Sequence, residues 1–134
     1  MSVVVGFVPT PEGAAALEQA IRSADDLGTG LVVVNVTRGH GLRHETNTDD
    51  TAYLDQLDRD LEASGLPHIV LHPVGDFDPS EEILSAAERH GANLIVLGLR
   101  RRTPVGKLFL GSTSQRVLLE AECPVLAVKA HHPA

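Results

Sequence analysis

The stretch GLRRRTPVGKLFLGSTSQ, residues 98–115, decides the fold we expect for this chain. It follows the apolar run 94–97, which has the length and composition of a buried strand. A helical pattern begins at Ser112, so a basic, glycine-bounded loop leads from a strand to a helix N-terminus. Backbone N–H groups and the positive end of the helix dipole meet at such a junction, which suits phosphate. The stretch therefore predicts a strand, a loop and a helix with an anion site between them.

Outward from this stretch, short apolar runs alternate with amphipathic segments. The β-branched runs predict buried strands at 2–8, 31–36, 68–74, 94–97 and 124–128. Cap residues, N-terminal prolines and terminal glycines predict helices at 11–28, about 50–64, 79–91 and 112 to about 120. Pro73 cannot donate a ladder hydrogen bond, which moves the third strand to a sheet edge. The alternation predicts an α/β fold.

Right-handed crossovers turn this order into an open, parallel, five-stranded sheet flanked by four helices. With the third strand at an edge and the first in the centre, the expected strand order is 3-2-1-4-5. Ligands of such sheets bind beyond the carboxyl ends of the strands, where the strand order reverses. The basic loop after the fourth strand is therefore expected at the binding edge.

Composition limits the classes of ligand and partner. The chain has 134 residues, a formal net charge of -7 and an aromatic content of 3%, which disfavours nucleic-acid binding. We expect one domain over residues 1–134. Acidic side chains concentrate in residues 39–65, whereas residues 98–111 carry four bases and no acid. The single cysteine excludes an internal disulfide, and no run is long enough to span a membrane, so we expect a cytoplasmic protein without membrane contact.

Several familiar catalytic and metal motifs do not fit. Lys107 follows Gly106, but Leu108 stands where a P-loop needs Ser or Thr. His40 and His44 are four residues apart, but Gly39 and Gly41 disfavour a helix there, so we expect no metal site. The sequence pairs no base or orienting acid with Ser112, and we expect no catalytic residues.

The chain resembles the universal stress protein family of small α/β nucleotide-binding domains. The resemblance covers nearly the whole chain and is carried by the turn at 11–13, the stretch 75–84, the run GANLIVLG at 91–98 and the closing segment 111–126. It implies a Rossmann-like sandwich of the adenine nucleotide alpha-hydrolase type. It also implies homodimerisation through the last strand, Val125 to Val128, which we expect to be an unpaired edge.

Nucleotide-binding members of this family carry Gly, two residues, Gly, nine residues, then Gly and Ser or Thr. On this chain the first and last glycines are Gly98 and Gly111, the hydroxyl is Ser112, and the middle position is Arg101. The family also implies an acid at the end of the first strand, where this chain has Val8. Arginine can replace backbone cradling of phosphate by side-chain clamping, because guanidinium binds phosphate bidentately.

The leading hypothesis is a stress-response or regulatory module that binds ATP, AMP or a related phosphorylated ligand, with or without a divalent cation. We expect its ligand at the sheet edge, contacted by Val8, Pro9, Thr10, Val34, Asn35, Val36, Gly98, Arg100, Arg101, Gly111, Ser112, Thr113 and Ser114. The competing hypothesis is a dimeric interaction module without nucleotide, which Arg101 and Val8 favour. A third is slow ATP hydrolysis.

Overall fold

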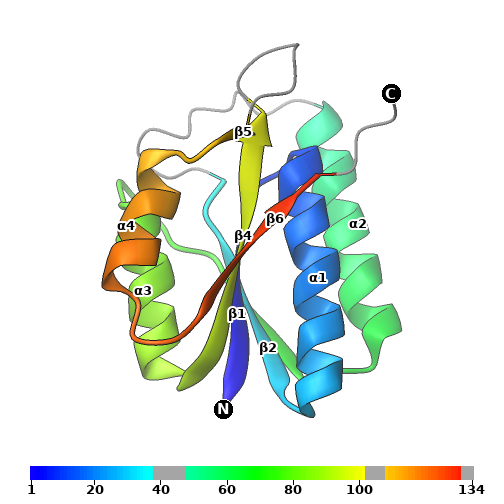
Figure 1. Ribbon diagram of the computed structural model, residues 1–134. Coiled ribbons are helices and arrows are strands. Elements are labelled where there is room, and N and C mark those ends of the chain that lie inside the picture. The colour runs from blue at the N-terminus through cyan, green and yellow to red at the C-terminus, as the bar shows by residue number, and fades with distance from the viewer. Residues whose placement is uncertain (38–47, 102–107, 131–134) are drawn as a thin grey trace.

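The computed structural model describes the backbone of residues 1–37, 48–101 and 108–130, and their side chains except those of 48–50, 100, 101, 108 and 109. Strands and helices alternate along the chain, except that β5 follows β4 directly (Figure 1). Their order is β1 (Ser2–Phe7), α1 (Pro11–Leu27), β2 (Gly30–Asn35), α2 (Thr48–Ser64), β3 (His68–Leu71), α3 (Pro79–Arg89), β4 (Ala92–Arg101), β5 (Leu108–Phe109), α4 (Ser112–Glu120) and β6 (Val125–Lys129).

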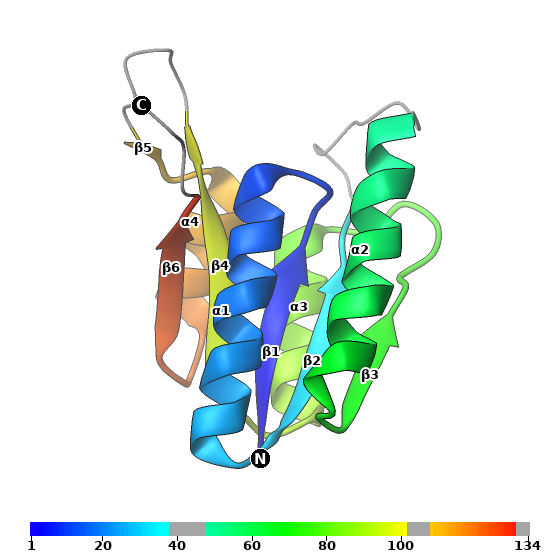
Figure 2. The ribbon, with the colours of Figure 1, turned by 90° about the vertical axis from the view of Figure 1, so that its right-hand side faces the viewer.

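Five of the strands form one parallel sheet in the order β3-β2-β1-β4-β6 (Figure 2). The predicted fifth strand is β6, so the predicted order 3-2-1-4-5 is confirmed. β1 lies in the centre, with β2 on one side and β4 on the other. Strand order therefore reverses between β1 and β4, and a ligand site is expected beyond their carboxyl ends.

The helices cover the sheet in two layers (Figure 1). On one face α1 and α2 pack over side chains that include Val3, Val5 and Phe7. On the other face α3 and α4 pack over Val4 and its neighbours in β2 and β4. Successive residues of a strand point to opposite faces, so a continuous apolar run serves both layers. This is why the strands have no alternating polar residues.

Strands β3 and β4 differ in length from the prediction. β3 ends at Leu71, before Pro73, because proline removes a donor from the ladder. β4 was expected to end at Leu97 but runs to Arg101. Its last residues pair antiparallel with β5, which was predicted as loop. A two-residue strand has too little sequence pattern to be recognised without its partner.

Candidate functional site

A small pocket lies at the predicted edge of the sheet, beyond the carboxyl ends of β1 and β4. It encloses about 90 Å³, compared with roughly 300–1,000 Å³ for typical small-molecule pockets. Its wall is mainly apolar and its polar groups come from helix N-termini. The lining residues are Gly6, Val8, Thr10, Glu12, Gly13, Val36, Ile83, Leu97, Gly98 and Thr113.

The N-terminus of α1 forms one side of this pocket and is tightly built. Thr10 is the N-cap, and its Oγ1 accepts a hydrogen bond from the Gly13 N–H at 3.1 Å. A Cβ at Gly13 would lie 1.8 Å from the carbonyl oxygen of Val8, so only glycine fits there. A Cβ at Gly98 would lie 2.5 Å from the carbonyl oxygen of Glu12. Gly98 is therefore needed where β4 and α1 approach backbone to backbone.

The N-terminus of α4 contributes Thr113 to the same pocket and is built differently. Its N-cap is Gly111, which provides no side-chain hydrogen bond, and its first turn contains no acid. The Gln115 N–H bonds to the Gly111 carbonyl at 2.9 Å, so regular helix bonding begins there. The preceding N–H groups belong to the orphan donors of a helix start, and the dipole makes this end attractive to an anion.

The structure brings five of the predicted site residues together in the pocket: Val8, Thr10, Val36, Gly98 and Thr113. Pro9 is buried beside them in the turn before α1. Gly111 and Ser114 are half-buried and Ser112 is exposed, all at the start of α4. These residues lie at one edge of the sheet, as the topology predicts.

The other predicted residues are placed differently. Val34 is completely buried in the core beneath α3 and α4. The Asn35 Oδ1 accepts from both the backbone N–H and the hydroxyl of Thr37, shaping the end of β2. The backbones of Arg100 and Arg101 belong to β4 and pair with Phe109 and Leu108, while their side chains lie outside the described residues.

The backbone of Arg101 does not have the conformation that would require glycine. A family glycine there suggests a need for positive φ, yet no described non-glycine residue has a positive φ. Arg101 therefore lies in ordinary strand backbone at the end of β4.

Five lining residues were not predicted: Gly6, Glu12, Gly13, Ile83 and Leu97. Glu12 and Gly13 lie about one helical turn after Val8, the predicted strand end. Their place in the first turn of α1 could have identified them as lining residues. Ile83 comes from α3, and its Cδ1 would lie 2.7 Å from a Cβ at Gly6. That approach depends on how α3 packs on β1, which sequence spacing does not give.

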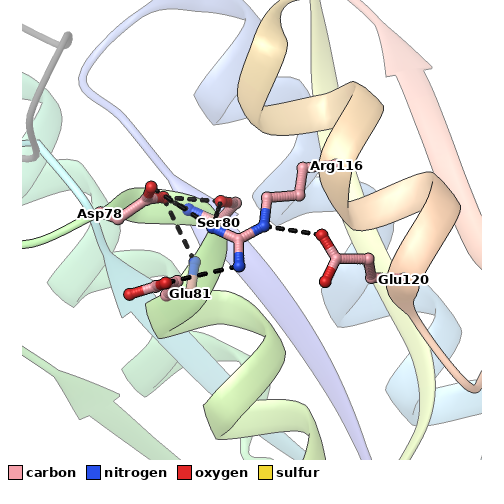
Figure 3. A network of polar contacts seen from close by, with 5 residues as sticks. All are labelled: Asp78, Ser80, Glu81, Arg116 and Glu120. Carbon is pink, nitrogen blue, oxygen red and sulfur yellow. Dashed lines mark hydrogen bonds and ion pairs between the residues drawn. The ribbon is translucent and has the colours of Figure 1, made fainter.

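A polar network ties α4 to the first turn of α3 (Figure 3). Arg116 Nη1 donates to Ser80 Oγ at 3.1 Å and to Asp78 Oδ2 at 3.4 Å, and Nη2 donates to Glu81 Oε1 at 3.4 Å. Within α4, Arg116 Nε donates to Glu120 Oε2 at 2.7 Å. This last hydrogen bond is the main reason that the pKa of Arg116 is raised.

Asp78 also caps α3 from within this network. Its Oδ1 accepts from the Ser80 hydroxyl at 2.6 Å and from the N–H groups of Ser80 and Glu81 at 2.9 and 3.4 Å. The Ser80 hydroxyl is the largest cause of a lowered pKa for Asp78. The two N–H groups and the charge of Arg116 add to it, against partial burial.

A larger hollow of about 430 Å³ lies at the opposite end of the sheet, between α3 and the turn that follows α4. Ala87, Ala121 and Cys123 are part of its lining, together with three glutamates. It is remote from the switch point, so its size alone does not make it the functional site.

In the described ranges, no three His, Cys, Asp or Glu side chains group as a metal site. No described helix has the length and apolar character needed to cross a membrane.

Comparison with known proteins gives the family. Residues 1–129 match the universal stress protein family. A universal stress protein from Mycolicibacterium smegmatis is 43% identical over 129 residues, covering 96% of this chain and 98% of that protein. The structure of a universal stress protein from Archaeoglobus fulgidus superposes with a TM-score of 0.74 at 25% identity, covering 96% of this chain and 98% of the other. A second Archaeoglobus structure, in complex with dAMP, has a TM-score of 0.69 at 23% identity with the same coverage. This chain belongs to the universal stress protein family.

Proposed function

We propose that this protein binds an adenine nucleotide, ATP or AMP, or a related phosphorylated ligand, and acts in a stress response through binding and not turnover. One observation carries the proposal: the N-termini of α1 and α4 converge on one pocket beyond the carboxyl ends of β1 and β4. The family relative that holds dAMP supports the choice of ligand. We propose further that the whole chain is one cytoplasmic domain.

The two sides of the pocket suit different parts of a nucleotide. At α4, uncapped N–H groups and the hydroxyls at 112–114 suit a phosphate. At α1, Thr10 already uses its oxygen as a cap acceptor, and Val8 and Val36 present apolar surface. Because the enclosed volume is only about 90 Å³, the ligand would lie partly over the open edge of the sheet. We place the phosphate at α4 and the nucleoside towards α1 and β2.

Small molecules released from the purified, heat-denatured protein test this proposal by mass spectrometry. We expect an adenine nucleotide in the released fraction, and a calorimetric response of the emptied protein to ATP, ADP or AMP. An empty protein with no response to any of the three would contradict nucleotide binding. That result would support the alternative, a nucleotide-free dimeric module. The small pocket and the apolar Val8 favour this alternative.

Two substitutions at position 101 separate side-chain clamping from backbone cradling. If the guanidinium clamps phosphate, Arg101→Ala should weaken ATP binding by roughly tenfold, as for loss of a charged hydrogen bond. Arg101→Gly should do the same. If this arginine instead prevents binding, Arg101→Gly should create ATP affinity that Arg101→Ala does not.

We also propose homodimerisation through β6. This strand pairs with β4 on one side, and its other edge has no strand partner in the part of the chain described. Leu126 in β6 is 38% exposed, and Leu119 on the adjacent α4 is 85% exposed. A second copy could pair at this edge and cover both leucines. Light scattering should give a dimeric mass that Leu126→Arg shifts to monomer, while Leu27→Arg, at the exposed end of α1, leaves it unchanged.

A further inference from the structure

Arg116 connects two helices that both line the candidate pocket. Three of its contacts cross from α4 to the first turn of α3, and the fourth is the bond to Glu120 within α4 (Figure 3). Guanidinium is suited to this because its donors lie in one rigid plane. The Arg116 side chain is 37% exposed and the side chains of Asp78, Glu81 and Glu120 are 49%, 64% and 52% exposed, so the network lies at the surface between the two helices.

The network lies one helical turn from the pocket on each helix. On α4, Thr113 precedes Arg116 by three residues, and on α3, Ile83 follows Ser80 by three. Residues three apart lie on the same side of a helix. Thr113 and Ile83 are both lining residues. A contact that fixes Arg116 against Ser80 therefore also fixes the distance between these two walls.

Helix α4 buries little apolar surface against the rest of the domain. Val117 is its only buried residue, while Leu118 and Leu119 are 40% and 85% exposed. Most helical stability in proteins comes from packing of a buried face. With one such side chain, the polar contacts to α3 form a larger share of what orients α4.

We infer that Arg116 is a positioning residue that holds the N-terminus of α4 in the orientation needed to receive the phosphate. The guanidinium does not touch the ligand; it acts through Ser80, Asp78 and Glu81 on the first turn of α3. The part of this inference that concerns phosphate rests on the function proposed above. The part that concerns the order of α4 does not.

Amide hydrogen exchange of the ligand-free protein tests the order of α4 directly. The Gln115 N–H closes the first turn of α4 on Gly111, so its exchange reports opening of that turn. We expect Arg116→Gln to speed this exchange at least fivefold relative to β1 amides. Arg22→Gln is the matched control, because Arg22 makes an i,i+4 ion pair with Glu18 on the surface of α1. Unchanged exchange at Gln115 in Arg116→Gln would overturn the inference.

Calorimetry with AMP and with adenosine tests the link to phosphate. Arg116→Gln should weaken AMP binding about fivefold, within the range reported for residues that act at a distance, and leave adenosine binding unchanged. Glu120→Gln, which keeps all three contacts to α3, should behave as wild type. Equal losses for both ligands would overturn the inference. Wild-type protein that binds neither ligand would instead contradict the proposed function, while the exchange result would still decide the role of Arg116. Arg116→Lys allows the same comparisons should the Gln variant not fold.

Discussion

The N-termini of α1 and α4 reach the same pocket but are built in opposite ways. At α1, the Thr10 hydroxyl caps the helix, Glu12 places an acid in the first turn, and glycines at 13 and 98 allow close backbone approach. At α4, Gly111 caps without a side chain and no acid follows. The donors of α1 are thus partly used by the fold itself, whereas those of α4 are free of a side-chain cap. This difference is the reason that we propose α4, and not α1, as the phosphate-binding end of the pocket.

The largest expected effect comes from Gly13→Ala in the α1 turn. Alanine normally stabilises a helix relative to glycine by about 1 kcal/mol, but here its Cβ would lie 1.8 Å from the Val8 carbonyl oxygen. Backbone on both sides must shift, so we expect the free energy of unfolding to fall by about 3 kcal/mol or more. Urea unfolding followed by circular dichroism measures this. A loss below about 1 kcal/mol would show that the turn relaxes easily.

Gly98→Ala should destabilise the protein less than Gly13→Ala. The corresponding distance to the Glu12 carbonyl oxygen is 2.5 Å, so a smaller movement relieves the overlap. We expect a loss of about 1–3 kcal/mol, measured in the same way. A larger loss than for Gly13→Ala would contradict the ranking by distance.

Removing the α1 cap has a smaller effect. Thr10→Ala deletes the acceptor for the Gly13 N–H, and we expect a loss of about 1 kcal/mol in the free energy of unfolding. Thr10→Ser keeps the hydroxyl and should retain most of the stability. At α4, Ser112→Ala should change stability by less than about 0.5 kcal/mol, because Ser112 is exposed and is not the cap. Equal losses at the two helices would remove the contrast between them.

Giving α4 a cap like that of α1 should trade ligand affinity for stability. Gly111→Ser introduces an acceptor at the N-cap, where serine is better than glycine by a few tenths of a kcal/mol. The new hydroxyl would compete with a bound phosphate, so we expect AMP binding to weaken severalfold in a calorimetric titration. Gly111→Ala adds a Cβ without an acceptor and is the control. Unchanged AMP affinity in Gly111→Ser would place the phosphate elsewhere.

The N-cap of α3, Asp78, is ionised, whereas the Thr10 cap of α1 is neutral. The two caps should therefore respond differently to pH. The pKa of Asp78 is lowered in the folded protein, chiefly by the Ser80 hydroxyl. A carboxylate with a lowered folded pKa stabilises the protein above its ordinary pKa and loses that contribution as pH falls below about 4. Asp78→Asn should therefore reduce the acid dependence of urea midpoints between pH 6 and pH 3, and Thr10→Ala should not. Parallel pH profiles for wild type and Asp78→Asn would contradict this.

Periodicity and cap residues predicted the strand order and all four helices because those signals are local. Strand β5 could not be predicted, since two residues carry too little pattern and its pairing with Arg100 and Arg101 depends on β4 running past Leu97, which the apolar run did not indicate. The same limit applies to the pocket. Strand ends identified Val8, Thr10 and Val36, but Ile83 enters only because α3 packs tightly against Gly6. Gly98 was predicted as a ligand contact from the family pattern and lines the pocket, but its close approach to the Glu12 carbonyl also gives it a packing role that the pattern does not show.

The hollow beyond the far end of α4 contains a thiol whose reactivity depends on the packing around it. Cys123 lines that hollow and is half-buried, and burial raises the pKa of its thiol. Since thiolate is the reactive form, alkylation at neutral pH should be slow while the turn after α4 stays closed. The chain has one cysteine, so alkylation reports on the surroundings of this turn alone. A change that loosens the packing around this turn should therefore raise the rate of alkylation of Cys123.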